Sequence, residues 1–179
     1  MPSLLSSVVL LSLLCLLPLL STASNSSDLA TTTAVFLSAP SFAVVGASND
    51  ETKFGTIVFK TMLEQGLNAV PVNPFVSESQ GISCLDTLAS LPDPAHTSIS
   101  IVTQPAVTLQ ILRQASALGI LAVWLQPGAQ DETVLQFINS TMDDTTYIYT
   151  PAIFADTGGP CLFDNPAMPD LVSTLEALG

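Results

Sequence analysis

The stretch Phe42-Ala-Val-Val-Gly-Ala-Ser-Asn-Asp-Glu-Thr-Lys-Phe-Gly55 contains, in order, an apolar strand, a loop of small residues and the start of a helix. The apolar run ends at Gly46, where the lack of a Cβ lets a ligand approach the backbone closely. Gly55 opens an apolar helical stretch, and the first N–H groups of a helix suit a phosphate. The stretch therefore predicts a nucleotide-type ligand, with a tight strand-to-helix turn that binds nothing as the alternative.

Strand-like and helix-like patterns alternate from residue 34 onward. The strand-like segments are short and continuously apolar, as parallel strands covered on both faces are. They comprise residues 42–45, 69–72, 99–103, 121–125 and a weaker segment at 147–150. Helices are expected over residues 55–65, from Pro105 to a stop at Gly119, and after a capping Asp131. This alternation predicts an α/β fold, a three-layer, doubly wound sheet of about five mostly parallel strands.

The ends of four predicted strands are rich in Gly, Pro and small polar residues. These ends lie at residues 46–48, 73–74, 103–105 and 126–128. Ligands of doubly wound sheets bind at the C-terminal ends of the strands, where the topology switches direction. We therefore expect all four segments to rim one crevice.

Five motifs, in this order and spacing, resemble the single-domain CoA-binding proteins. The motifs are Val44-Val-Gly-Ala-Ser48, Lys53-Phe-Gly55, Pro71-Val-Asn-Pro74, Ala122-Val-Trp-Leu-Gln-Pro-Gly128 and Gly158-Gly-Pro-Cys161. Members of this family are small Rossmann-like proteins, similar to the CoA-binding domain of the succinyl-CoA synthetase α subunit. The similarity is greatest to fungal-type members and covers residues 34–163. It implies a protein that binds coenzyme A or an acyl-CoA.

The resemblance also assigns parts of the ligand to positions of this chain. Gly46, Ala47 and Ser48 would face the diphosphate, with Lys53 at the phosphate rim. The adenosine part would lie near Asn73 and Pro74. The rest of the predicted cofactor site consists of Phe54, Gly55, Thr103, Gln104, Pro105, Gln126, Pro127 and Gly128.

The chain departs from the family pattern directly after Asn73-Pro74. Family members often have a basic residue at this place, where it can reach a phosphate. Here Phe75, Val76 and Ser77 follow. The 3′-phosphate of the ligand would lack that partner, whereas Phe75 could stack on adenine.

No residues of the sequence form a recognisable catalytic set. We find no Ser-His-Asp arrangement, no acid pair with supporting context and no metal-ligand cluster, so binding without catalysis is the leading prediction. One alternative is an NAD(P)-dependent oxidoreductase, although G-x-G-x-x-G is absent and Val72-Asn73-Pro74 replaces the acidic residue that usually holds the ribose. Another alternative is a secreted interaction domain that kept the fold and lost its nucleotide ligand.

The charge balance excludes two classes of partner. The chain has 15 acidic residues against 3 basic ones and a net charge of −12. Nucleic acids and anionic membrane surfaces both require many Lys and Arg side chains. The expected partner is therefore a small nucleotide-type ligand held mainly by backbone amides. The oligomeric state is left open.

An apolar leader precedes the domain. Residues 4–20 are almost entirely apolar, and Ser21-Thr22-Ala23 suits cleavage by signal peptidase. We predict a signal peptide over 1–23, a linker over 24–33, the domain over 34–163 and a C-terminal tail over 164–179. The predicted location is the secretory route or a membrane tether, with a cytoplasmic protein from a misassigned start codon as the alternative. On the secretory route, Asn139-Ser140-Thr141 could accept a glycan.

Two cysteines, Cys84 and Cys161, lie outside the leader. They could pair in an oxidising compartment, and two free thiols are the alternative. Their separation and the lack of nearby His or Cys argue against a metal site.

Overall fold

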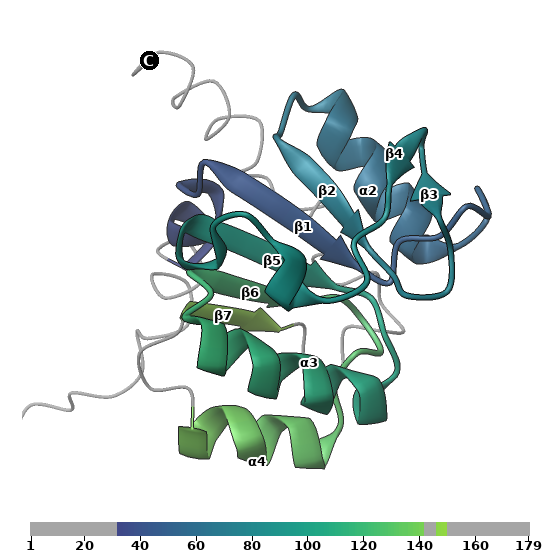
Figure 1. The fold of residues 1–179 in the computed structure, drawn as a ribbon. Coiled ribbons are helices and arrows are strands. Elements are labelled where there is room, and N and C mark those ends of the chain that lie inside the picture. Colours follow the sequence, from purple (N-terminus) through teal and green to yellow (C-terminus); the bar gives the residue numbers. More distant parts are fainter. Residues whose placement is uncertain (1–31, 142–145, 150–179) are drawn as a thin grey trace, which may run out of the picture.

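A five-stranded parallel sheet forms the centre of the computed structural model, which describes residues 32–141 and 146–149 (Figure 1). The strands are β1 (Ser41–Val45), β2 (Ala69–Val72), β5 (Thr97–Ile101), β6 (Ala122–Leu125) and β7 (Thr146–Tyr149). The long helices are α2 (Phe54–Glu64), α3 (Pro105–Leu118) and α4 (Glu132–Thr141). The shorter elements are the hairpin of β3 (Glu78–Ser79) and β4 (Ile82–Ser83), and the 3-10 helices η1 (Leu88–Ser90) and η2 (Pro94–His96).

The strand order is β2-β1-β5-β6-β7, and every neighbouring pair is parallel. The chain passes from β1 through α2 to β2 on one side, and β5 then lies on the other side of β1. The direction of winding therefore changes between β1 and β5, which is the switch point of a doubly wound sheet. This arrangement confirms the predicted α/β, Rossmann-like fold.

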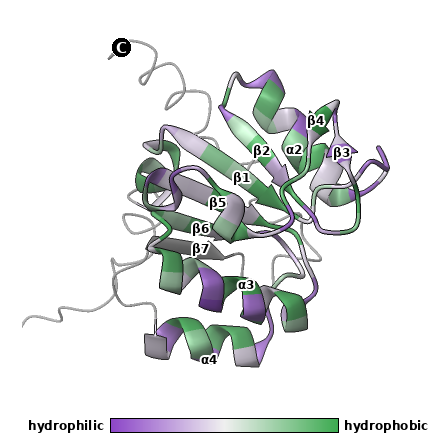
Figure 2. Cartoon of the chain, viewed as in Figure 1, coloured by the Kyte–Doolittle hydropathy of each residue, from purple (hydrophilic) through white to green (hydrophobic). Residues whose placement is uncertain are grey.

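Side chains of each strand alternate between two separate apolar layers. On one face, Phe42 and Val44 pack with α2 residues such as Phe59 and with the helical residues 32–37. On the other face, Ala43 and Val45 belong to the cluster formed with α3, α4 and η1. Figure 1 shows α3 and α4 side by side beneath the sheet. Hydrophobic and hydrophilic residues alternate along α3, as expected for a helix with one buried face (Figure 2).

Residues 84–91, between the β3–β4 hairpin and η2, combine a bridge to β2 with a single helical turn. A helical turn is present only at η1, where the Thr87 side chain accepts a hydrogen bond from the Ala89 N–H at 3.0 Å. Before it, Leu85 forms a parallel bridge to Val72 at the free edge of β2. The polypeptide thereby covers an edge strand that would otherwise expose its backbone groups.

None of the helices in the described ranges is both long and apolar enough to cross a bilayer. The predicted leader, Cys161 and the predicted C-terminal tail all lie outside the residues that the structure describes.

Candidate functional site

The strand ends that the sequence predicts to meet lie on one line across the sheet. Val45 is in register with Val72 on one side and with Ile101 on the other, and Ile101 is in register with Leu125. The ladder continues one residue beyond these ends. The Gly46 N–H donates to the Val72 carbonyl at 3.0 Å, and the Gln126 N–H donates to the Ile101 carbonyl at 3.0 Å. The loops after β1, β2, β5 and β6 therefore leave the sheet at the same level.

The two glycines of the loop between β1 and α2 are explained by contacts within the protein. A Cβ on Gly46 would lie 2.3 Å from the Val102 carbonyl oxygen, and the φ angle of Gly46 is +97°. A Cβ on Gly55 would lie 2.2 Å from the Gly46 carbonyl oxygen. The sequence attributes Gly46 to the close approach of a ligand. In the structure, however, the Gly46 backbone lies directly against the Val102 carbonyl group. A larger residue at position 46 would therefore disturb the fold as well as any ligand site.

Three side chains fix the carbonyl groups of this loop. Asn73 Nδ2 donates to the Ala47 carbonyl at 2.6 Å, and Ser79 Oγ donates to the Ser48 carbonyl at 2.6 Å. Thr56 Oγ1 donates to the same Ser48 carbonyl at 2.9 Å and accepts from the Ser48 N–H at 3.2 Å. Sequence reasoning missed Thr56 and Ser79. Thr56 stands in the first turn of the helix that follows the loop, which is a usable signal, whereas Ser79 is brought there by the small hairpin.

The N-terminus of α2 has no cap from a side chain. Lys53 is the N-cap residue, makes no capping hydrogen bond with its side chain, and is followed by no acidic residue in the first turn. The N–H groups of Thr56 and Ile57 donate to the Lys53 carbonyl at 3.0 and 3.1 Å. The N–H groups of Phe54 and Gly55 donate to no other residue in the described part of the chain. The positive end of the helix dipole thus has two backbone donors without an internal partner, one on the exposed Phe54 and one on the buried Gly55.

The charges around the loop are unevenly distributed. Lys53 is exposed, and within the described ranges it forms no ion pair. Lys60, about two turns further along α2, lies 3.8 Å from the Glu51 carboxylate, which also accepts a hydrogen bond from Gln80 at 2.7 Å. Hydrogen bonds from the side chain and the backbone of Thr52 lower the pKa of Asp50, and the charge of the nearby Lys53 lowers it further. Lys53 is therefore the cation that a bound anion could recruit.

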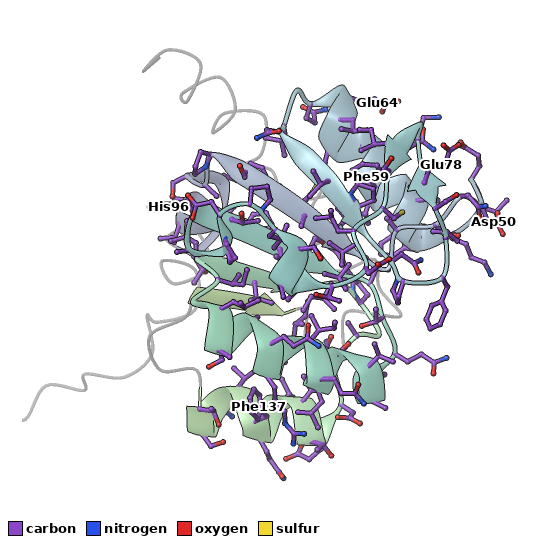
Figure 3. All side chains as sticks on the ribbon, in the orientation of Figure 1. Asp50, Phe59, Glu64, Glu78, His96 and Phe137 are labelled. Carbon is purple, nitrogen blue, oxygen red and sulfur yellow. The ribbon has the colours of Figure 1, made fainter. Side chains whose placement is uncertain are left out.

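Acidic groups flank the same end of the molecule. Figure 3 shows Asp50 and Glu78 near the β3–β4 hairpin, whereas His96 lies at the opposite end of β5. Close to the hairpin, the half-buried thiol of Cys84 has a raised pKa, first because of burial and then because of the Glu78 and Asp86 carboxylates. Cys84 forms no disulfide with any residue that the structure describes, and both alternatives, pairing with Cys161 and two free thiols, stay open.

The remaining predicted site residues follow β5 and β6. Pro105 occupies the first turn of α3 behind an exposed Gln104, whose side chain makes no capping hydrogen bond. Thr103 Oγ1 lies 2.8 Å from Thr108 Oγ1. Gln126 is fully buried, and its Nε2 donates to Ser100 Oγ at 2.9 Å. The Gln126 side chain is therefore occupied within the sheet and is not part of the exposed rim.

Pro127 and Gly128 complete the rim beyond β6. Pro127 is half-buried, and Gly128 is exposed with a φ angle of +86°, which favours glycine. These residues follow β6 at the level where Gly46 follows β1, as the strand register requires. The structure thus gathers all four predicted segments at one edge, and their role in binding a ligand stays a prediction.

Comparison with known proteins identifies the family of this chain. The family model described as the CoA binding domain matches residues 40–149, which cover all the strands of the sheet. The chain belongs to the CoA-binding domain family. Membership confirms the family resemblance that the five motifs predict.

The chain is also similar to a curated protein and to two solved structures. The chain is 32% identical over 99 residues to the α subunit of an ADP-forming acetate–CoA ligase II from Pyrococcus furiosus. That match covers 55% of this chain and 21% of the relative, so the matched part spans about a fifth of the larger protein's length.

A conserved hypothetical protein from Pyrococcus furiosus is 31% identical, with a TM-score of 0.54, and the match covers 63% of this chain and 97% of that one. A hypothetical protein from Pyrococcus horikoshii is 22% identical, with a TM-score of 0.61, and the match covers 73% of this chain and 90% of that one. At this level of identity the second likeness shows the fold alone.

Proposed function

We propose that this chain binds coenzyme A, or an acyl-CoA, at the C-terminal edge of its sheet and does not itself transform the ligand. The observation that carries the proposal is the uncapped N-terminus of α2, where two free N–H groups lie beside Lys53. These donors suit a diphosphate, and the absence of an acidic residue from the first turn leaves their positive potential uncancelled. Membership of the CoA-binding domain family supports the identity of the ligand.

The end of β2 argues against the oxidoreductase alternative. A dinucleotide-binding sheet usually places an acidic side chain there to hold the ribose hydroxyls. In this chain the residue is Asn73, and its side chain already bonds to the Ala47 carbonyl and to the Phe75 N–H. An NAD ribose would have to compete with these two internal bonds.

Ligand-dependent melting tests the proposal directly. A ligand that binds only the folded state raises the melting temperature, so the chain is heated with CoA, acetyl-CoA, NAD, NADP and ATP in separate samples. We expect CoA or acetyl-CoA to raise the melting temperature and the others to raise it less. A shift with NAD and none with CoA or acetyl-CoA would contradict the proposal, and no shift with any ligand would favour an interaction domain that has lost its nucleotide.

Two lysines on the same helix supply a matched pair of variants. Lys53→Ala removes the unpaired cation at the N-terminus of α2 and should weaken CoA binding by about 1–3 kcal/mol. Lys60→Ala removes an equal charge whose side chain is engaged with Glu51, and it should leave the affinity nearly unchanged. Equal affinities for both variants and the unmodified protein in calorimetry would show that the Lys53 side chain does not contact the diphosphate.

We further propose that the chain enters the secretory route and that its nearest relatives are fungal-type members of the family. The apolar run over residues 4–20 and the small residues that follow it support entry. Asn139 is exposed, so its sequon is accessible to a glycosylating enzyme. We expect N-terminal sequencing of the native protein to find a chain that begins near Ser24 and carries a glycan at Asn139. An unglycosylated chain that begins near Ala30 would support the cytoplasmic alternative.

A further inference from the structure

Phe75 is far more exposed than the other large apolar side chains at this edge of the molecule. Its side chain is 91% exposed, compared with 40% for Phe54, 45% for Ile57 and 46% for Val107. Burying a phenylalanine ring contributes about 1.5–3 kcal/mol. The ring of Phe75 therefore has most of its apolar surface still available to a partner.

The backbone beneath this ring is tied to the loop between β1 and α2. The Phe75 N–H donates to Asn73 Oδ1 at 2.9 Å, and Asn73 Nδ2 donates to the Ala47 carbonyl at 2.6 Å. The Asn73 N–H in turn donates to the Leu85 carbonyl at 2.9 Å. One asparagine side chain thus links the exposed ring to the loop whose neighbouring helix end offers two free N–H groups.

The position of Phe75 in the topology indicates which part of a nucleotide it would meet. In doubly wound sheets the pyrophosphate lies at the N-terminus of the first helix, and the adenosine ribose lies at the end of the second strand. Phe75 follows the second strand of this sheet, β2, by three residues. The base is attached to that ribose, and aromatic side chains bind bases by stacking on their π-faces.

We infer that Phe75 is the stacking platform for the adenine ring of the ligand. This inference rests on the proposed function, because it specifies the base contact within the same site. The ring contributes to affinity for the adenosine half of CoA and contributes nothing to the pantetheine half. Phe75 is a binding residue that determines specificity for a nucleotide-bearing ligand.

The test compares ligands that share the pantetheine arm and differ in the base. The affinities of CoA and of 4′-phosphopantetheine, which lacks adenosine, are measured by calorimetry on the full chain and on four variants. Phe75→Ala and Phe75→Leu both remove the aromatic face, and Phe75→Leu retains an apolar side chain. Phe75→Trp retains an aromatic face. Val107→Ala deletes an exposed apolar side chain on α3 and serves as the matched control.

We expect Phe75→Ala and Phe75→Leu to weaken CoA binding by about 5- to 150-fold, which is the range measured for the loss of one stacked base. Phe75→Trp and Val107→Ala should bind CoA like the unmodified protein, and the affinity for 4′-phosphopantetheine should not change in any variant. Melting temperatures without ligand should be equal for the Phe75 variants, because the ring is exposed.

Two outcomes overturn the inference in distinguishable ways. CoA affinity that is normal in both Phe75→Ala and Phe75→Leu, or an equal loss for 4′-phosphopantetheine, would show that the ring does not stack on adenine while CoA binding itself stands. Failure of the unmodified protein to bind CoA would overturn the proposed function together with this contact.

Discussion

Replacing Gly55 by alanine should disturb both the stability of the domain and the candidate site. A Cβ at this position would lie 2.2 Å from the Gly46 carbonyl oxygen, 2.8 Å from the Gly46 carbonyl carbon and 3.2 Å from the Ala47 nitrogen. All three are backbone atoms, so no side chain can rotate to make room. The loop and α2 must instead move apart, and the free N–H groups of α2 move with them.

The expected loss follows from two opposing effects. In an exposed helix interior, alanine is more favourable than glycine by about 1 kcal/mol. Forcing an extra methyl group into a packed site costs typically about 1–3 kcal/mol. Because the atoms that the methyl group would meet all belong to the backbone, they cannot rotate away. We therefore expect a cost near the upper end of this range. The net loss in the free energy of unfolding should be about 2 kcal/mol.

Urea denaturation followed by circular dichroism measures this loss, and calorimetry with CoA measures its effect on the site. Gly66, two residues after the end of α2, is the matched control: no atom lies within 4 Å of its Cβ position, and its φ angle is +76°. Gly66→Ala should lose about 1–2 kcal/mol through backbone strain alone and keep its CoA affinity. A Gly55→Ala protein as stable as the unmodified one would refute the contact between α2 and the loop.

Two further predictions concern the stability of an Asn73 variant and the reactivity of Cys84. Asn73→Asp replaces the donor to the Ala47 carbonyl, at 2.6 Å, by an acceptor, and should lower the free energy of unfolding by about 1–3 kcal/mol in urea denaturation at neutral pH. An effect near zero would mean that Asn73 does not hold the loop. The Cys84 thiol, whose pKa is raised by burial and by the Glu78 and Asp86 carboxylates, should react with iodoacetamide more slowly than a free cysteine at pH 8. The double variant Glu78→Gln, Asp86→Asn should react faster, as measured by peptide mass spectrometry, and an unchanged rate would leave burial as the cause.

The fold could be predicted from the sequence because the patterns that mark its strands are local. Continuous apolar runs identify each parallel strand, and glycine and proline mark where the strands end. The common edge of the four loops follows from parallel pairing alone. The order of the strands does not follow in this way, because β1 and β5 pair through their backbones although they are distant in the sequence.

Contacts between segments that are distant in the sequence also explain why some site residues could not be assigned from the sequence. The sequence shows that Gly46 lacks a Cβ, but the atom that requires this is the Val102 carbonyl oxygen on the neighbouring strand end. Gln126 follows its strand as a ligand-binding polar residue would, yet its side chain turns to Ser100 on β5. Ser79 reaches the loop only because the β3–β4 hairpin folds over it. In each case the deciding partner comes from another element.

Because the protein is strongly negative, we expect its affinity for CoA to respond to salt differently from that of a site rich in lysine and arginine. Nucleotide sites built from many lysines and arginines lose affinity as salt rises, because salt screens attraction. This chain carries a net charge of −12, and Asp50, Glu51 and Glu78 lie near the loop that offers Lys53. The long-range field of the protein therefore repels an anionic ligand, whereas the free N–H groups of α2 act at contact distance, where screening is weak.

Raising the ionic strength from about 20 to about 200 mM shortens the screening length to below about 10 Å and should remove more repulsion than attraction. The affinity for CoA should accordingly stay constant or increase over this range in calorimetry. Lys53→Ala should show a larger increase than the unmodified protein, because only repulsion is then left to screen. A tenfold or greater loss of affinity in the unmodified protein would mean that side-chain cations hold the ligand. Such a result would assign the main contact with the ligand to one of the chain's 3 cationic side chains, Lys53, Lys60 or Arg113, in place of the free N–H groups of α2.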